Sequence, residues 1–571
     1  MAALKIENLI TDHLDLWTAA VRPKSSAGRG SNSKLELTGI KKLRELILEL
    51  AVRGKLVPQD PSDEPASVLL ERITAEKTRL VKEGKIKKSK VLPKISEEEQ
   101  PFDLPEGWEW GCLGDIVAII RGITFPASEK HCEPSEDRIA CLRTANVQDK
   151  IEWDDLLYVK TSFVKRLEQR VEVGDIVMSM ANSKELVGKV AYIEKIPSGS
   201  ATFGGFLSVI RPYEIDASFL MTVLRAPQTR SVLIDRSSQT TNIANISLEK
   251  LNPLVIAIPP LPEQHRIVAK VGELMALCDQ LELRSESQLA AHQMLVETLL
   301  ATLTDSANAD ELAQNWARLS THFDTLFTTE ASIDALKQTI LQLAVMGKLV
   351  SQDPSDEPAS TLLERIAAEK AQLVKEKKIK KEKPLPAISE DEKLCNLPEG
   401  WLQCRLNDII KISSGDGLTS KQMASDGSIP VFGGNGITGY HDQFNVSQPT
   451  IVIGRVGFYC GSVHITPSKA WVTDNAFITS FSHVNVHLEF LAWLLKATNL
   501  NEHDNATAQP VISGRKLYPI VVCLPPLAEQ HRIVAKIDQL MTICDQLKSR
   551  LQTSQQTQLA LAESLVEGAL A

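Results

Sequence analysis

The stretch Pro-Pro-Leu-Pro-Glu-Gln-His-Arg-Ile-Val-Ala-Lys at residues 259–270 decides the fold, because it occurs twice in the 571-residue chain. It returns with one change at residues 525–536, 266 residues later. After each Pro-Pro pair an acidic residue, Glu263 or Glu529, suits the first turn of a helix. No Pro or Gly interrupts residues 273–304. The first copy therefore predicts a helix of about 40 residues, or about 60 Å at 1.5 Å per residue.

Both predicted helices carry apolar residues that recur every seven positions. This heptad seam comprises Ile267, Leu274 and Leu281 in the first helix and Ile533, Leu540 and Leu547 in the second. Such a seam buries against another helix. Because the chain holds two of these helices, we expect them to pair with each other as an antiparallel coiled coil with pseudo-two-fold symmetry.

A second repeat has a different register. Residues 54–67 recur at 347–360 and residues 104–108 recur at 397–401, both 293 residues later. The offset falls from 293 residues before these segments to 266 residues after them, so the segments in between differ in length. These are residues 109–258 and 402–524, which also share little sequence. Two nearly identical frames therefore hold two different inserts. Identical frames favour a common partner and unlike inserts favour unlike targets, whereas simple duplication of a stable fold is the alternative.

The frames and the inserts have different local patterns. The frames are predicted to be helical at residues 43–56, 336–349, 66–83 and 359–376, with a glycine near the end of each first helix. The inserts show short β-type runs, for example at residues 175–179, 206–210, 450–454 and 517–524. The predicted fold class is therefore α+β, with two mixed α/β domains separated by long helices.

Composition excludes several classes of protein. Lys and Arg total 63 against 72 Asp and Glu, a net charge of −9, which argues against a uniformly basic nucleic-acid binder. The inserts themselves are nearly neutral, with 17 basic and 19 acidic residues in the first and 8 of each in the second. No apolar run approaches the ~20 residues that span a bilayer. The nine scattered Cys lack a C-x-x-C pair, so we expect reduced thiols in a cytoplasmic protein without a metal site.

Polar, amide-bearing loops in the inserts are the candidates for contact with DNA. Asn and Gln can pair with adenine, and Arg or Lys with guanine, in the major groove. The candidate residues are Arg143, Lys184, Lys189 and Asn242 in the first insert and Asn435, Arg455, Lys469 and Gln509 in the second. Ordinary turn roles are the alternative for each. Lysine runs at residues 82–94 and 375–383 are typical of solvated linkers, with phosphate contact as the alternative.

Several of these motifs resemble the DNA-specificity subunit of type I restriction–modification enzymes. The blocks at residues 104–108 and 259–268, with their second copies, match that family's insert boundaries, and residues 121–124, 429–437 and 453–457 look like parts of its target-recognition domains. The likeness runs from about Leu37 to the end of the chain. It implies an N-terminal helical region with a linker (1–103), a first target-recognition domain (104–258), a first spacer helix (259–304), a central helical region (305–396), a second target-recognition domain (397–524) and a second spacer helix (525–571).

The resemblance implies a non-catalytic subunit. By this resemblance, each target-recognition domain would read one half of a split, asymmetric site in double-stranded DNA. The helices would set the gap and dock two adenine methyltransferase subunits, and restriction subunits would join the complex. The chain itself then needs no cofactor, and S-adenosylmethionine, ATP and Mg are expected on the partner subunits.

Two other functions compete with this interpretation. Residues 432–436 fit the F-x-G-x-G signature of a methyl-donor site, which predicts a self-sufficient adenine methyltransferase. The adenine-methylation loop is missing, however, because residues 252–255 lack its second Pro and its aromatic residue, and we interpret 432–436 as a strand and turn. No G-x-x-x-x-G-K-[ST] phosphate loop exists either. The third possibility is a two-fold scaffold that does not read DNA.

Overall fold

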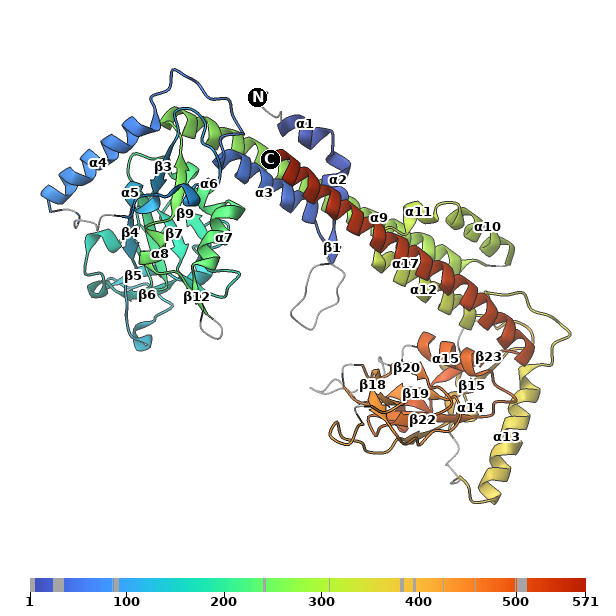
Figure 1. Ribbon diagram of the computed structural model, residues 1–571. Helices are drawn as coiled ribbons and strands as arrows, with labels where there is room; N and C mark the ends of the chain where they lie inside the picture. The colour runs from blue at the N-terminus through green and yellow to red at the C-terminus, as the bar shows by residue number, and fades with distance from the viewer. Residues whose placement is uncertain are drawn as a thin grey trace. The chain divides into compact units, whose positions relative to one another are not determined.

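The computed structural model describes most of the chain. The described residues are 6–23, 35–84, 86, 92–239, 243–307, 309–379, 385–393, 397–424, 426–457, 459–498, 500 and 511–571. They form two compact units: unit 1 contains residues 1–287 and 555–571, and unit 2 contains residues 288–554. Two long helices, α9 (Leu261–Asp305) and α17 (Leu527–Leu570), each contribute residues to both units. Both cover the helices predicted from the repeated Pro-Pro motif (Figure 1).

The frame of each unit is helical, as predicted. In unit 1 it contains α1 (Ile6–Thr11), α2 (Leu14–Ala19), α3 (Thr38–Val52) and α4 (Ala66–Lys82), with a short ladder between β1 (Arg22–Pro23) and β2 (Leu35–Glu36). In unit 2 it contains α10 (Ala309–Ser320), α11 (Phe323–Leu326), α12 (Glu330–Val345) and α13 (Ala359–Lys375). The predicted helix at 43–56 begins earlier and ends earlier, at Val52. Gly54 follows with φ +66, the left-handed conformation that favours glycine after a helix.

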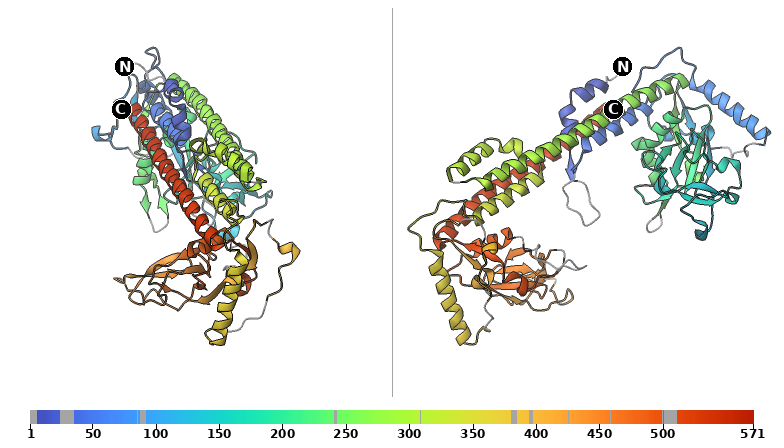
Figure 2. Two further views of the ribbon diagram at one scale, coloured as in Figure 1. Left: turned by 90° about the vertical axis from the view of Figure 1, so that its right-hand side faces the viewer. Right: turned by 180° about the vertical axis from the view of Figure 1, so that it is seen from behind.

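The heptad seams are buried inside their own units. Ile267, Leu274, Ile533 and Leu540 are each less than 9% exposed. In unit 2 the seam of α17 shares one buried cluster with Ile333, Leu336 and Ile340 of α12, which lies beside it (Figures 1 and 2). In unit 1, Arg44 of α3 donates to Asp279 of α9 at 2.6 Å. The first part of α9 thus contacts α3 and that of α17 packs against α12, and pairing of α9 with α17 stays a prediction.

The same hydrogen bonds recur in the two frames. The indole Nε1 of Trp108 donates to Glu263 at 3.0 Å, and that of Trp401 donates to Glu529 at 2.9 Å. A glutamine amide donates to each carboxylate at 3.2 Å, from Gln59 in unit 1 and Gln352 in unit 2. Burial raises the pKa of both carboxyl groups, although these donors act to lower it. Further matched pairs are Arg266–Asp63 with Arg532–Asp356, Arg44–Asp279 with Lys337–Asp545, and Lys55–Leu570 O with Lys348–Thr304 O.

The described residues of the first insert form four small sheets and four α-helices. The strands are β3 (Glu109–Cys112), β4 (Val117–Arg121), β5 (Arg138–Leu142), β6 (Leu157–Lys160), β7 (Ile176–Ser179), β8 (Ala181–Asn182), β9 (Val190–Tyr192), β10 (Ala201–Phe203), β11 (Leu207–Pro212), β12 (Ser238–Gln239), β13 (Ala244–Asn245) and β14 (Val255–Ile258). They pair in the orders β4-β11-β7-β9, β10-β5-β6, β12-β13-β8 and β14-β3. The helices are α5 (Leu113–Ile116), α6 (Ala217–Arg225), α7 (Pro227–Asp235) and α8 (Leu248–Leu251).

The described residues of the second insert form three sheets whose strand orders correspond to three of the four sheets of the first insert, despite the different sequence. Its strands are β15 (Leu402–Arg405), β16 (Ile410–Ser414), β17 (Ile429–Gly433), β18 (Gly436–His441), β19 (Ile451–Gly454), β20 (Val463–Ile465), β21 (Trp471–Val472), β22 (Ala476–Phe481) and β23 (Val521–Leu524), and its helices are α14 (Leu406–Ile409), α15 (Leu488–Ala497) and α16 (Gly514–Leu517). They pair as β16-β22-β19-β20, β18-β17-β21 and β15-β23. The strand predicted at 517–524 is therefore shorter, because α16 takes up its first residue. Residues 432–436 form the strand and turn that the sequence predicted.

Removing the indole donor of Trp401 should weaken unit 2. In Trp401→Phe the indole N–H that donates to the carboxylate of Glu529 is removed. Hydrogen bonds to a charged group contribute about 1.5–3 kcal/mol to stability. We expect the free energy of unfolding to fall by that amount in chemical denaturation. Trp316→Phe is the volume-matched control, because Trp316 is partly buried in the same unit and its indole makes no hydrogen bond to a described residue. Equal losses in both variants would contradict this role.

Candidate nucleic-acid interface

The inserts place their loops together at one end of the four-stranded sheet, which we call the loop end. In the second insert it comprises residues 414–416, 433–435, 454–457 and 473–475, and in the first insert residues 121–122, 180–184 and 204–206. Backbone hydrogen bonds join these loops: Arg455 N donates to Asn475 O at 2.9 Å, and Met180 N donates to Phe206 O at 2.9 Å. The loop end is thus a fixed surface rather than a set of independent turns.

Glycines allow the loops of the second insert to approach one another closely. A Cβ on Gly454 would lie 2.2 Å from the carbonyl oxygen of Gly434, and one on Gly415 would lie 2.3 Å from the carbonyl oxygen of Val472. The hydroxyl of Ser462 donates to the same Gly434 oxygen at 2.6 Å. The two motifs at 429–437 and 453–457, distant in sequence, therefore meet through their glycine backbones.

Asn435 and Arg455 of the predicted set are brought to this end of the second insert. Asn435 is exposed on the turn between β17 and β18. Arg455 follows β19 and is half-buried, with its guanidinium carbon 5.3 Å from the ring centroid of Phe477 and Nη1 donating to Ser414 Oγ at 3.4 Å. Its Nε atom is buried and has no hydrogen-bond partner among the described residues. This arginine is held in place while part of its donor capacity is unused.

Lys469 is the third candidate of the second insert that the structure describes. Its side chain is exposed, and Nζ lies 5.2 Å from the ring centroid of Phe444, which is itself 44% exposed. A cation over an exposed aromatic ring fits contact with phosphate or with an unstacked base. Gln509, and Asn242 in the first insert, lie outside the described residues.

Two candidates of the first insert are engaged inside the protein. Arg143 follows β5 and forms an ion pair with Asp155 at 2.7 Å, and Nζ of Lys189 donates to Gln148 Oε1 at 2.7 Å. Lys184 is different: it is exposed in the loop after β8. Of the three, Lys184 is the cation best placed to reach a ligand.

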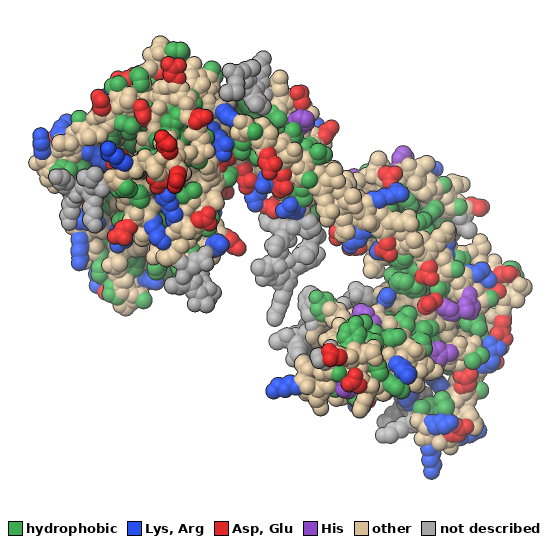
Figure 3. All heavy atoms as spheres, viewed as in Figure 1, with side chains coloured by type: hydrophobic (Ala, Val, Ile, Leu, Met, Phe, Trp, Pro, Cys, Tyr) green, Lys and Arg blue, Asp and Glu red, His purple; other side chains and the backbone are tan. Residues whose placement is uncertain are grey.

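Sequence reasoning missed exposed side chains at the loop ends. Arg121 is exposed at the end of β4, Phe206 is 68% exposed, and Tyr459 is 52% exposed. The signal for Phe206 was the preceding pair Gly204-Gly205, which allows the chain to approach Gly122. On the face seen in Figure 3, hydrophobic side chains and histidines gather on the second insert, whereas basic and acidic side chains are interspersed on the first.

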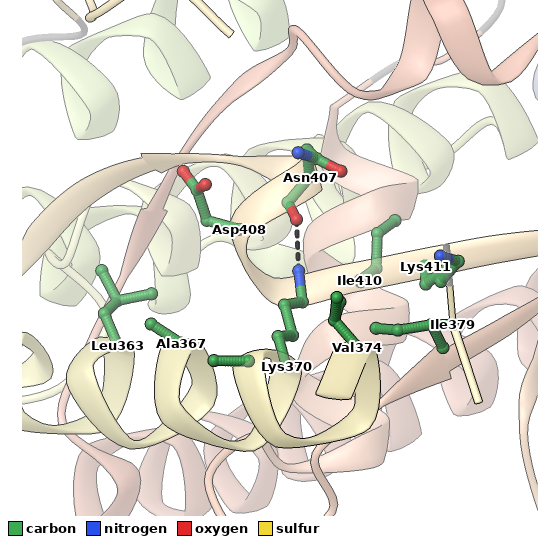
Figure 4. Close-up of a pocket in the computed structure, with 10 residues that line it drawn as sticks. Leu363, Ala367, Lys370, Val374, Ile379, Asn407, Asp408, Ile410 and Lys411 are labelled. Atoms are coloured by element: carbon green, nitrogen blue, oxygen red, sulfur yellow. Dashed lines mark hydrogen bonds between the residues drawn. The ribbon is translucent and has the colours of Figure 1, made fainter. Parts of the chain in front are cut away.

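Each insert is also joined to the last helix of its frame, α4 in unit 1 and α13 in unit 2. Lys370 of α13 donates to the carbonyl oxygen of Asn407 across a pocket of about 410 Å³ (Figure 4). In unit 1, Lys77 of α4 donates to Gly114 O at 2.9 Å. Both lysines thus contact the one-turn helix at the start of the insert, and both bonds are internal.

Two kinds of feature are absent from the described residues. They contain no group of three or more His, Cys, Asp or Glu that could hold a metal ion. None of the described helices is both long enough and apolar enough to cross a membrane. The features that stand out are the exposed cations, amides and aromatic rings of the loop ends.

Comparison with known proteins gives consistent matches. The family model for the type I restriction modification DNA specificity domain matches residues 105–291 and 398–554. The specificity subunit of the type I restriction enzyme EcoEI from Escherichia coli is 43% identical over 99% of this chain and 100% of its own length, and that of EcoAI from the same species is 44% identical with the same coverage. A solved structure from a study of complex assembly in a type I system aligns with 82% of this chain and 99% of its own, at 17% identity and a TM-score of 0.48.

A side chain at position 454 should disrupt the loop end of the second insert. The methyl group of Gly454→Ala would meet backbone atoms that cannot move aside, and overpacking of this kind costs about 1–3 kcal/mol. We expect a lower melting temperature and faster proteolysis within the second insert. Gly417→Ala is the control, because nothing lies within 4 Å of the added carbon. Unchanged melting of Gly454→Ala would show that the loops do not pack as described.

Proposed function

The chain belongs to the family of type I restriction–modification DNA specificity subunits, and on that premise we propose that its two inserts read two different halves of one split DNA site. Members of this family are the non-catalytic, DNA-recognising component of the enzyme. The interpretation of residues 432–436 as a methyl-donor site is therefore wrong, in agreement with their place in a strand and a tight turn.

The observation that carries the proposal is the combination of matched frames with unlike loop ends. The Trp–Glu bonds of the two frames differ by only 0.1 Å, at 3.0 and 2.9 Å, and the glutamine bonds are equal at 3.2 Å. The loop ends differ in the same places, since Arg121 stands at the end of β4 where Ser414 stands at the end of β16. Because the two frames are alike, each holds the loop end of its insert in the same way. Because the loop ends carry different side chains, they select different base pairs.

The frames are proposed to dock the partners. Two equivalent frames suit two copies of one protein, and we propose that these are adenine methyltransferase subunits, with restriction subunits joining the complex. S-adenosylmethionine, ATP and Mg then belong to those partners. The chain would divide as its sequence predicts, into helical regions (1–103, 305–396), target-recognition domains (104–258, 397–524) and spacer helices (259–304, 525–571). Antiparallel pairing of α9 with α17 would set the half-sites about one DNA turn apart, roughly 34 Å.

Sequencing methylated adenines tests the reading of half-sites. In cells that carry the chain with its methyltransferase, we expect methylation at one split site with two unlike halves and a fixed gap. Arg455→Ala should relax one position of only one half, because a base-reading arginine contributes about 1–3 kcal/mol of discrimination. Lys189→Ala is the control, since that lysine is bonded within the protein, and it should leave the site unchanged. Methylation at an uninterrupted site, or a methylome that does not depend on the chain, would refute the proposal.

The charge distribution makes a separate prediction about affinity. The inserts are almost neutral, and the net charge of −9 lies mainly in the frames, so the isolated chain has little basic surface for phosphates. We expect weak, strongly salt-sensitive DNA binding by the chain alone and tight binding by the complex with its methyltransferase. Fluorescence anisotropy with a duplex that carries the methylated site measures both. Equal affinities with and without the partner would contradict this expectation.

A further inference from the structure

Each unit has a groove where the insert meets its frame. In unit 2 the groove encloses about 830 Å³ between α12, the start of α17, α15 and the hairpin of β19 and β20. The polar and aromatic residues that line it include Lys337, Asn435, Tyr459, His464, Trp493 and Lys496. In unit 1 the corresponding groove, between α3, the start of α9, α6 and β9, encloses about 970 Å³. The two grooves differ in whether the cation contributed by α15 or α6 has a partner within the protein, and in the number of carboxylates that line them.

Lys496 has no counter-charge among the described residues of the unit 2 groove. Its Nζ lies 4.3 Å from the ring centroid of Trp493, and it has no hydrogen bond or ion pair with any described residue. Burial lowers the pKa of this ammonium group. Because desolvating a charge is costly unless it is paired, an anion in the groove would offset a penalty that the folded protein already carries.

His464 adds a second unsatisfied group beside it. The Nε2 atom of its ring is buried and has no hydrogen-bond partner among the described residues. Burial, and then the charge of Lys496, lower the pKa of the imidazole. A Cβ on Gly436 would lie 3.2 Å from this ring, so the ring packs directly against the turn that carries Asn435. The groove therefore joins the frame to the loop end.

The one acidic residue that lines this groove is already paired. Asp545 accepts from Lys337 at 2.6 Å, which leaves Lys496 as the excess positive charge of the lining. The amide of Asn435 and the hydroxyl of Tyr459 supply uncharged hydrogen-bonding groups at the same place. Such a lining suits a ligand with negative charge and several acceptor oxygens.

In the unit 1 groove the residue that corresponds to Lys496 already has hydrogen-bond partners, and carboxylates also line the groove. Gln264 accepts from Asp216 N at 3.0 Å and Gln530 accepts from His487 N at 2.8 Å, which places α6 and α15 at matching positions. Nine residues further on, Arg225 corresponds to Lys496. Arg225 donates to the carbonyl oxygens of Asp149 and Val190, whereas Lys496 has no such partner. Five carboxylates also line the unit 1 groove: Glu36, Asp149, Glu194, Asp279 and Glu282.

We propose that the unit 2 groove binds a phosphate group of the DNA backbone, held by Lys496 together with His464 and Asn435. This step rests on the proposed function, since it assumes that the loop end of the second insert faces DNA. A phosphate suits the groove better than a partner's carboxylate, because donors converge on it from α15, β20 and the turn next to Arg455, and a phosphate offers more acceptor oxygens. In the unit 1 groove Arg225 already donates to backbone carbonyl oxygens, and Lys150 lies in a lining that holds five carboxylates, so the two halves of the site are held differently.

The test measures DNA affinity of the full chain in complex with its methyltransferase, over a series of potassium chloride concentrations. The probe is a fluorescein-labelled duplex that carries the methylated site. Losing one phosphate contact should reduce the slope of log affinity against log salt by about 0.9 in Lys496→Gln, and Lys496→Arg should restore it. The methylated sequence should stay the same, because a phosphate contact carries no sequence information.

Arg225→Gln is the matched control in unit 1, and its salt slope should equal that of the unchanged complex. Melting curves of all variants identify any loss of folding. An unchanged slope in Lys496→Gln, while the unchanged complex still binds the duplex, overturns this inference alone. Failure of the unchanged complex to bind any duplex overturns the proposed function.

Two other outcomes would identify a different ligand. If Lys496→Gln instead abolishes calorimetric binding of AMP with no change of slope, the ligand is a free nucleotide. If it weakens only assembly with the methyltransferase, the ligand is an acidic partner. Both of these outcomes overturn the proposal.

Discussion

Each unit depends on one buried carboxylate at the start of a long helix. Glu263 and Glu529 are each 1% exposed, and each accepts hydrogen bonds from an indole at the start of the insert and from a glutamine in the frame. A buried charge is tolerated only when it is paired or hydrogen-bonded. Three segments that are distant in sequence must therefore meet at the first turn of the helix, and this joint sets how the insert is held.

The sequence predicted the frames well because their signals are local. A Pro-Pro pair, an acidic first turn and an unbroken run of helix-forming residues define α9 and α17, and the glycine after α3 ends that helix. The partner of the seam was harder to predict. Periodicity identifies the face of a helix that is buried, but several faces in this chain are equally apolar. In unit 2 the seam of α17 shares its buried cluster with Ile333 and Ile340 of α12 and also with residues of α9, and nothing in the spacing of its own residues distinguishes these two helices.

The sequence alone did not separate available from engaged side chains among the candidate binding residues, for a physical reason. The type of a residue shows which hydrogen bonds its side chain can donate. It does not show whether an acceptor inside the protein already receives them. Arg143 is paired with Asp155 and Lys189 with Gln148, and neither partner is marked by any motif. Lys496 is the opposite case: it lies in an apolar stretch of helix that reads as core, yet it lacks a partner among the described residues. Only the fold separates engaged cations from available ones.

The two inserts show how one backbone carries two surfaces. Gly122 in the first insert and Gly415 in the second occupy the same place after a sheet strand, and an added Cβ would lie 2.2 and 2.3 Å from a backbone oxygen. Close approach of the backbones therefore requires glycine in both, whatever else changes. The residue just before it, Arg121 or Ser414, makes no such approach and differs between the inserts. Constraint and variation thus fall on neighbouring positions, so a change of side chain at the loop end can alter the exposed surface without altering the sheet that presents it.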